Sequence, residues 1–211
     1  MHESHSDSHF AGPAASILPV ALFTAAYMAA AVWGAFASGN SEFVFYIIIM
    51  VVLIAVVWTV HARVALTAAT LWALSAWGLL HMAGGLVPAP EGWPTNEGAS
   101  VLYSVWLIPE RLKYDQVVHA FGFGVTTWVC WQGLKAAMVA DGREVAPTFG
   151  LLLLCWAAGL GFGALNEIVE FVAVLTIPET NVGGYRNTGW DLVSNAVGAT
   201  VAAVAIRFGE S

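Results

Sequence analysis

Residues 148–176 read TFGLLLLCWAAGLGFGALNEIVEFVAVLT and form a long apolar run. The run is continuous and rich in Leu, Ala and Val, without the alternation that a membrane β-strand shows, so it predicts a helix. It exceeds the ~20 residues that cross a bilayer, which predicts a helix that tilts or extends past the hydrocarbon. Two acidic residues, Glu167 and Glu170, nevertheless lie inside it. Because ionisable groups are costly in lipid, they indicate a functional site in the membrane or at its edge.

Five further apolar runs accompany this one, and the composition is that of a membrane protein. Of the 211 residues, 59% are hydrophobic and 10% are charged, whereas soluble domains carry about a quarter charged residues. We therefore predict an all-α fold, an integral membrane bundle of six transmembrane helices in a single domain over residues 14–207. The predicted spans cover about 14–37, 43–60, 64–82, 115–138, 148–176 and 190–207. Residues 1–13 are predicted to be a disordered polar N-terminus, and residues 208–211 a C-terminal tail.

Small and aromatic residues refine this arrangement. Gly159, Gly161 and Gly163 are predicted to let another helix approach the fifth span closely. Gly84 and Gly85 are predicted to end the third helix. Several Trp residues near predicted span ends or in loops are expected to anchor the protein at the membrane interface. They are Trp33, Trp58, Trp93, Trp106, Trp131 and Trp190.

The charge pattern excludes one class of partner and suggests an orientation. A net charge of −7 argues against nucleic acid, which requires a basic face. The N-terminus before the first run has no Lys or Arg, so we expect that run to be a retained span rather than a cleaved signal. Basic residues are slightly more frequent on the side that carries both termini, which predicts that both are cytoplasmic. That side has Arg63, Lys135, Arg143 and Arg207, and the other has Arg111, Lys113 and Arg186.

Three pairs of polar residues lie at helical spacing inside these spans. They are Asp115 with His119, Glu167 with Glu170, and Asp191 with Asn195. Residues three or four positions apart share a helix face, so each pair projects as a unit. Alternating spans bring the starts of the fourth and sixth helices beside the ends of the third and fifth. We therefore predict one polar site at one membrane face, with His81 from the end of the third helix beside it.

The donor atoms of this set suit a divalent metal. Carboxylate oxygens suit Mg²⁺ and Mn²⁺, and an imidazole shifts the preference toward Zn²⁺, Mn²⁺ or Fe²⁺. The predicted metal ligands are His119, Glu167, Glu170 and Asp191. Asp115 is the predicted catalytic base. The predicted substrate-binding residues are His81, Asn195 and Arg186, the last because a guanidinium pairs well with a phosphate or another anionic headgroup.

The long connector 83–114 carries an apolar stretch at 101–108, just before Pro109. This stretch is predicted to be a short re-entrant or interfacial segment that covers the site. Tyr103 and Tyr114 are expected to form hydrogen bonds within it.

Four stretches, taken in order, resemble a known family: residues 80–85 (LHMAGG), 114–119 (YDQVVH), 166–171 (NEIVEF) and 190–195 (WDLVSN). Over about 64–207 the chain is similar to the YjdF-like family of uncharacterised multi-pass inner-membrane proteins, and more distantly to the VanZ-like family. The resemblance implies a bacterial inner-membrane location, a multi-pass topology and a site formed by these four stretches, but it implies no particular reaction. VanZ-like proteins are linked to glycopeptide tolerance and the cell envelope, which implies envelope lipids or polymers as substrates. The Glu167–Glu170 pair departs from the single acid plus Gln common in VanZ-like chains.

These observations favour a multi-pass membrane protein that binds or processes an envelope lipid or lipid-linked substrate, with help from a divalent metal. Membrane lipid is the expected partner. One alternative is a non-enzymatic scaffold or stress-response protein whose polar cluster is structural, pinning three helices together. Another is a small proton-coupled transporter, although no inverted repeat or pair of broken helices is apparent. The sequence leaves the choice between enzyme, binding protein and carrier open.

Overall fold

The computed structural model describes residues 17–39, 41–95, 101–178 and 180–210, and most of them are helical. The helices are α1 (Leu18–Ser38), α2 (Ser41–Val64), α3 (Ala68–Leu86), α4 (Tyr114–Ala140), α5 (Phe149–Thr176) and α6 (Tyr185–Gly209). Between α3 and α4 lie a 3-10 helix, η1 (Leu102–Ser104), and an antiparallel hairpin of β1 (Trp106–Ile108) and β2 (Leu112–Lys113). The predicted helical fold is thus confirmed, with a short hairpin added. The predicted disorder of residues 1–13 lies outside the described residues.

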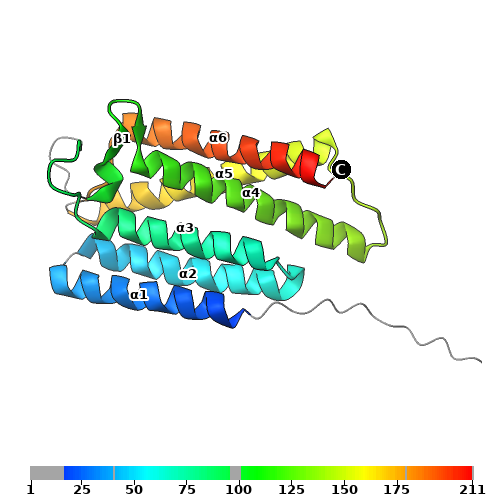
Figure 1. Cartoon of the computed structure of the whole chain (residues 1–211), viewed down its shortest axis with the longest axis horizontal. Helices are drawn as coiled ribbons and strands as arrows, with labels where there is room; N and C mark the ends of the chain where they lie inside the picture. Colours follow the sequence, from blue (N-terminus) through cyan, green and yellow to red (C-terminus); the bar gives the residue numbers. More distant parts are fainter. Residues whose placement is uncertain (1–16, 40, 96–100, 179, 211) are drawn as a thin grey trace, which may run out of the picture.

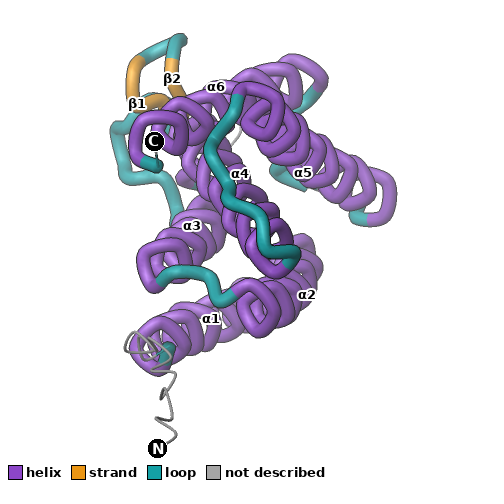
Figure 2. The backbone as a smooth tube through the Cα atoms, turned by 90° about the vertical axis from the view of Figure 1, so that its right-hand side faces the viewer, coloured by secondary structure: helices purple, strands orange, loops and turns teal. Residues whose placement is uncertain are grey.

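The six helices run back and forth along one axis in two groups (Figure 1). One group is α1 to α3 and the other α4 to α6, and α4 lies between them, in contact with α2 and α3 as well as α5 and α6 (Figure 2). The hairpin and the α5–α6 connection lie at one end of the bundle, whereas α1 begins and α6 ends at the other (Figure 1). The end of α3, the start of α4, the end of α5 and the start of α6 therefore meet at the hairpin end.

Local sequence sets several helix boundaries. Thr67 precedes α3 and Thr148 precedes α5, and each side chain accepts a hydrogen bond from the backbone N–H three residues later. Gly39 follows α1 in the left-handed conformation, with φ 65°, which glycine adopts without steric cost. At the start of α4, the Gln116 side chain accepts a hydrogen bond from the Lys113 N–H at 3.0 Å, as in a capping box.

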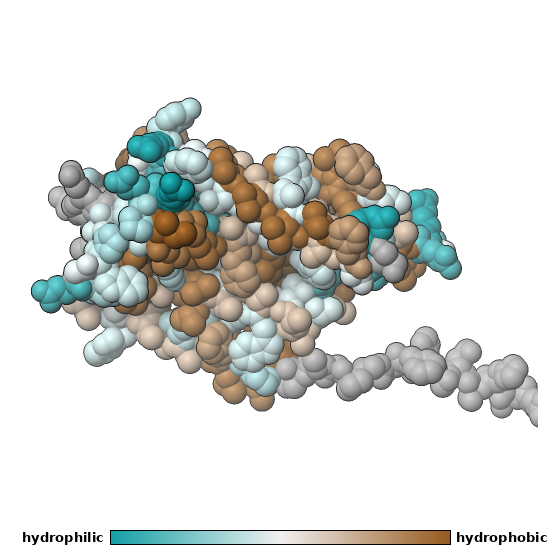
Figure 3. Space-filling view, turned by 45° about the horizontal axis from the view of Figure 1, so that its top comes forward, coloured by the Kyte–Doolittle hydropathy of each residue, from teal (hydrophilic) through white to brown (hydrophobic). Residues whose placement is uncertain are grey.

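Four helices, α1, α2, α5 and α6, are long and apolar enough to cross a membrane. Hydrophobic residues dominate the middle of the bundle and hydrophilic ones gather toward its two ends (Figure 3). Among the described helices, α3 and α4 do not meet that combination of length and apolarity. The polar content of α4 has a physical reason, because this central helix packs against four others and buries Gln116, His119 and Thr127. The protein is a membrane protein with several apolar helices, and the number six for its spans stays a prediction.

Glycines bring α4, α5 and α6 into close contact. A Cβ atom at Gly198 on α6 would overlap the backbone carbonyl of Ala120 on α4. Gly159 and Gly163 on α5 pack against side chains of α4 and α6 in the same way, so the predicted close approach is confirmed at these two positions. Gly161 differs, because a Cβ there would meet open space.

Helices α3 and α6 have boundaries that differ from the sequence expectation. Helix α6 begins at Tyr185 rather than near 190, and it ends at Gly209, so the expected C-terminal tail from 208 starts inside the helix. Helix α3 continues through Gly84 and Gly85 to Leu86. These two glycines do not end the helix. They make room for aromatic rings, which a Cβ atom at either position would strike.

Trp131 also differs from its predicted role as an interfacial anchor. Its side chain is 0% exposed and packs among apolar residues of α5 and α6. Trp33, Trp58, Trp93 and Trp190 are exposed, as anchors at a membrane interface would be. Position near a span end therefore does not distinguish a Trp that faces lipid from one that faces the bundle.

Candidate functional site

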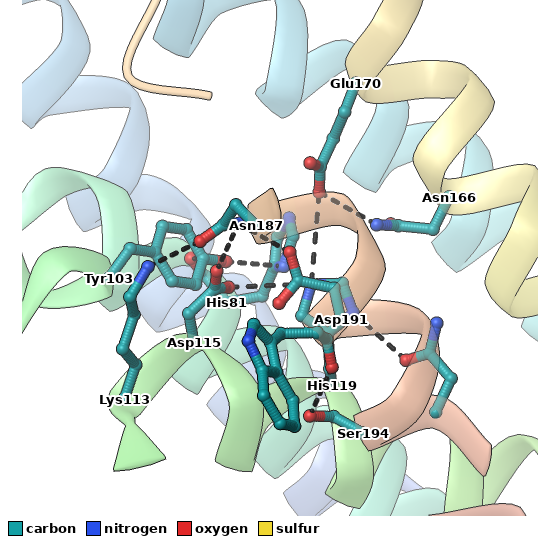
Figure 4. Close-up of polar contacts among 12 residues, drawn as sticks. His81, Tyr103, Lys113, Asp115, His119, Asn166, Glu170, Asn187, Asp191 and Ser194 are labelled. Carbon is teal, nitrogen blue, oxygen red and sulfur yellow. Dashed lines mark hydrogen bonds and ion pairs between the residues drawn. The ribbon is translucent and has the colours of Figure 1, made fainter. Parts of the chain in front are cut away.

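The three polar pairs meet around one imidazole at the hairpin end of the bundle (Figure 4). Nδ1 of His119 lies 3.0 Å from Oδ1 of Asn195 and 3.7 Å from Oε1 of Glu167. Its Nε2 lies 3.5 Å from Oδ1 of Asp115 and 3.9 Å from Oε1 of Glu170. Helices α4, α5 and α6 thus converge on one polar cluster, as their spacing predicts.

The bond to Asn195 assigns the two ring nitrogens of His119 different roles. An amide oxygen only accepts hydrogen bonds, so the Nδ1–H of His119 donates to Oδ1 of Asn195. In a neutral imidazole this leaves the lone pair on Nε2. The nitrogen able to bind a metal therefore faces Asp115 and Glu170, whereas Glu167 lies on the N–H side. A metal-ligating His commonly donates its other ring N–H to a carbonyl in this way.

Asn187, which the sequence analysis did not select, ties the cluster together (Figure 4). Its Nδ2 donates to Oδ2 of Asp191 at 2.5 Å and to Oδ2 of Asp115 at 3.2 Å. Its Oδ1 accepts from Nζ of Lys113 at 2.6 Å. Asn166 supports Glu170 in the same way, with a bond from Nδ2 to Oε1 at 2.9 Å. Each Asn precedes its acid by four residues on a helix, which is the signal that could have identified it.

Several buried polar atoms of the cluster have no hydrogen-bond partner among the described residues. They are both carboxylate oxygens of Glu167, Oδ1 of Asp191 and Nδ2 of Asn195. Asp191 and Asn195 are 0% exposed and Glu167 is 9% exposed. Native proteins pair most buried polar atoms because leaving one unpaired is costly. The cluster therefore presents acceptors that the protein itself does not satisfy.

Two groups of three residues in the cluster have the spacing of metal ligands. One is Asp115, His119 and Asp191, and the other is His119, Glu167 and Glu170. Within each group the candidate ligand atoms all lie within 4.8 Å of one another. Carboxylates with one imidazole suit Mn²⁺, Fe²⁺ or Zn²⁺, and the carboxylates alone suit Mg²⁺. The residues present fit a divalent cation, and the shared His119 limits them to one ion on its Nε2.

A cavity of about 90 Å³ lies beside the cluster. Its lining includes Glu42, Tyr46, His81, Tyr103, Asp115 and Glu170. A water needs ~10–15 Å³ of such space, so the cavity holds several waters or a small chemical group but not a whole lipid. Val101, Tyr103 and Ser104 of the segment around η1 are among the lining residues, so the predicted covering segment does lie over the site.

His81 is held against this cavity by Tyr103. The Tyr103 hydroxyl donates to the His81 carbonyl at 2.9 Å and lies 2.6 Å from Nδ1 of His81. Since a hydroxyl has one proton, Nδ1 must donate to it, which leaves the lone pair of His81 on Nε2. Burial, followed by the nearby carboxylates of Asp115 and Glu170, raises the pKa of Tyr103 well above its ordinary value, so its hydroxyl keeps its proton. Tyr103, and Tyr114 by a bond to the Leu80 carbonyl at 2.9 Å, thus bind α3 rather than their own segment.

Glu42 holds the connection between α5 and α6 against α2. Its two carboxylate oxygens each accept from the Asn181 N–H at 3.0 Å, and the Asn181 side chain donates to Oε2 at 2.9 Å. Glu42 is buried and lines the cavity. It adds a further acid to a site that already has four carboxylates around one imidazole.

Arg186 does not join the cluster. Its side chain is exposed and lines a separate hollow with Arg111 and Trp106. Arg186 therefore lies outside the group of residues around His119, and its role in binding a substrate stays a prediction. Residue 186 lies in the first turn of α6, and its side chain leaves the helix on a different face from Asn187 and Asp191.

Residues 19–209 match the model of a protein family described as "Predicted membrane protein (DUF2238)". The match covers most of the chain, so the protein belongs to this family of membrane proteins. No curated protein and no solved structure matches the chain. The similarity to an uncharacterised membrane protein family is therefore confirmed. The more specific resemblance to YjdF-like and VanZ-like proteins stays a prediction.

Proposed function

We propose that this protein holds a divalent metal ion in its polar cluster and binds or processes an envelope lipid or lipid-linked substrate there. The observation that carries the proposal is the set of buried acceptors without partners around His119. Glu167 has two unpaired carboxylate oxygens and Asp191 has one, while the lone pair of His119 faces Asp115 and Glu170. A cation on the lone-pair side of His119 would satisfy Oδ1 of Asp191 and neutralise Asp115 and Glu170, whereas the two oxygens of Glu167 would stay available to accept a proton or a donor from a substrate.

The hydrogen-bond pattern favours one ligand set within the cluster. Asp115 and Glu170 lie on the lone-pair side of His119, and Asp115 and Asp191 form a group of candidate ligands with His119. Asp115, Asp191 and Glu170 would therefore hold the ion with Nε2 of His119. Glu167 lies nearest the N–H side of the ring and would then be the carboxylate available to accept a proton. This exchanges the roles expected for Asp115 and Glu167. A bound metal would supply polarisation of a phosphoryl or carbonyl oxygen, or activation of water.

A purely structural cluster is less consistent with these contacts. Polar side-chain bonds between membrane helices contribute only about 0.6 kcal/mol on average. A network selected for stability would also pair its buried acceptors, and this one leaves several unpaired. A proton-coupled carrier is the remaining alternative, and proton flux in proteoliposomes that His119→Gln abolishes would favour it over a metal site.

We further propose that the protein crosses a bacterial inner membrane six times, with both termini in the cytoplasm. The antiparallel packing of α3 and α4 alongside the four helices that are long and apolar enough to cross a membrane supports six spans (Figure 1). The start of α1 and the end of α6 lie at the same end of the bundle (Figure 1), which supports termini on one side. Labelling of single cysteines placed at residues 90 and 143, one at each end of the bundle, tests this in intact cells. Reaction of both from the same side would overturn it.

Elemental analysis of the purified protein after incubation with Zn²⁺, Mn²⁺, Fe²⁺ or Mg²⁺ tests the metal site. We expect about one equivalent of bound metal per chain. Asp191→Asn and His119→Gln should abolish binding, and Asn187→Ala should weaken it by ~10–100-fold, as loss of a group that orients ligands does. Glu210→Gln, which alters a carboxylate at the opposite end of the bundle, is the matched control. No bound metal in the wild type, or equal binding in all variants, would disprove a metal site.

A further inference from the structure

A second hollow lies between the β1–β2 hairpin and the first turn of α6, which are adjacent in Figure 1. Its volume is about 950 Å³, which is the size of a typical small-molecule site. We call it the basic groove, after the three basic residues that line it: Arg111, Lys113 and Arg186. One acidic residue, Glu110, also lines it, so positive charge is in excess.

Two of the three cations of the basic groove have no acidic partner among the described residues. The guanidinium groups of Arg111 and Arg186 make no hydrogen bond or ion pair with any residue that the structure describes. Lys113 is more unusual, because it is only 8% exposed. Its ammonium donates one hydrogen bond, to Asn187, and lies 5.3 Å from the ring centre of Trp106. Since an ammonium has three donors, two remain for a ligand, and buried charges usually have such partners.

The start of α6 adds to the positive potential of the groove. Gly183 and Gly184 line it, and Gly184 caps the helix without a side-chain acceptor. The first N–H groups of a long helix attract anions, phosphate in particular. Together with two guanidinium groups and a buried ammonium, they form a site for a phosphate group.

Two features indicate that this phosphate belongs to a lipid. Trp106 and Trp190 line the basic groove, and Trp residues favour the level of lipid headgroups. A second feature is a hollow between α3, α4 and α6, which extends from Val117 and Val197 toward the opposite end of the bundle. Val197 and Val201 follow Trp190 at helical spacing, so the hollow and Trp190 share one face of α6. Its lining is mostly apolar, as a site for an acyl chain would be, and its polar residues Thr67, Thr70, Gln132, Lys135 and Glu210 lie toward the end opposite the hairpin.

We propose that the basic groove binds the phosphate of an anionic phospholipid headgroup, with an acyl chain along the hollow between α3, α4 and α6. This inference rests on the proposed function and names its substrate class. Lys113 and Asn187 line both the basic groove and the cavity of the cluster. Asn187 links Lys113 to Asp115 and Asp191. A phosphate bound by Lys113 therefore lies one side chain away from the carboxylates of the candidate metal site.

Native mass spectrometry of the detergent-purified protein tests this assignment. The probes are phosphatidylglycerol and phosphatidylcholine with identical acyl chains, and inorganic phosphate as a competitor. We expect phosphatidylglycerol to bind preferentially, and Arg111→Gln/Arg186→Gln to weaken it by about tenfold or more, since a hydrogen bond to a charged group contributes roughly 1.5–3 kcal/mol. The matched control is Arg63→Gln/Arg143→Gln, which removes the same charge at the opposite end and should leave binding unchanged.

Equal retention of both lipids, or equal loss in both double variants, would overturn the inference. If inorganic phosphate bound as tightly as phosphatidylglycerol, the groove would be a site for free phosphate, and the proposal that it binds a lipid would be overturned. Metal content separates this inference from the proposed function. Arg111→Gln/Arg186→Gln should keep its metal while losing lipid. If the wild type binds phosphatidylglycerol through the two arginines but holds no metal, lipid binding in the basic groove is supported and the proposed metal site is disproved.

Discussion

The two ends of the bundle both bury polar side chains, but they treat them differently. At the end opposite the hairpin, Gln132 accepts from the Thr67 N–H at 3.0 Å and donates to Oγ1 of Thr70 at 2.5 Å. Nearby, Lys135 on α4 pairs with Glu210 after α6 at 2.5 Å. At the hairpin end, Glu167 has two buried oxygens without partners. We call the end opposite the hairpin the closed end, because its carboxylate, amide and hydroxyl groups named here pair with one another, and its unpaired buried atoms among the described residues are ring nitrogens of His61 and Trp131. We call the hairpin end the open end, because its unpaired buried atoms include carboxylate oxygens that could bind a ligand.

This difference separates a structural polar network from a functional one. A network that holds helices together is stable when every donor finds an acceptor within it. A binding site must keep acceptors available and lose some stability for doing so. The closed end therefore explains how α3, α4 and α6 are joined, whereas the open end is where a ligand is expected.

The largest loss of stability should come from substitution of Gly198, because at this position the backbones of α4 and α6 are in direct contact. Gly198→Ala forces the two backbones apart, and overpacking of this kind costs about 1–3 kcal/mol. We expect the upper end of that range in thermal unfolding in detergent, together with loss of metal binding. Gly161→Ala, a helical glycine facing open space, is the control. A similar melting temperature for both variants would show that the close α4–α6 contact is not required.

The second-largest effect, on the stability of Glu167→Gln, tests whether the polar cluster at the open end is a binding site or a structural scaffold. Glu167→Gln removes a buried carboxylate without hydrogen-bond partners, so the metal-free protein should gain about 1 kcal/mol in unfolding free energy. Metal binding should persist, because Glu167 lies on the N–H side of His119. Chemical unfolding of the metal-free protein measures the change. A loss of stability in this variant would indicate that Glu167 supports the fold.

At the closed end, removal of a polar side chain should lower the unfolding free energy instead of raising it. Gln132→Met preserves side-chain length but leaves the Thr67 N–H and the Thr70 hydroxyl without their partner. We expect a loss of about 1 kcal/mol in unfolding free energy, with metal content unchanged. Thr59→Val, which removes an exposed bond to the carbonyl of Ala55, serves as the reference. If Gln132→Met altered metal content, the two ends would not be independent.

The smallest effect concerns the Lys135–Glu210 pair. The hydrogen bond from Lys135 holds the pKa of Glu210 below its ordinary value. A carboxyl with a lowered pKa in the folded state stabilises the protein above its unfolded-state pKa, and this contribution is lost as the pH falls through its folded-state pKa. Because the pair is partly exposed, the effect should be small. Thermal melts from pH 7 to pH 3 should show a shallower acid decline in Glu210→Gln than in the wild type.

Much of the helical architecture could be predicted from the sequence because it is local. An apolar run of about 18 residues or more is long enough to predict a membrane helix, so all six helices were expected close to their observed positions. The start of α6 was not, because residues 185–189 are polar. That turn is helical in the folded protein, where Asn187 bonds to Asp115 on α4 as well as to Asp191. A contact between helices cannot be read from the composition of one of them.

The sequence by itself determined that Asp115 and His119, like Glu167 and Glu170, share a helix face, because helical spacing is a property of a single segment. Only the tertiary structure decided which face meets which. It turned Nδ1 of His119 toward Asn195 and Nε2 toward Asp115 and Glu170. It also directed Arg186 into a different hollow and buried Trp131. The physical reason is that the partner across a helix interface depends on the rotation and approach of both helices, which close contacts such as Gly198 on Ala120 set.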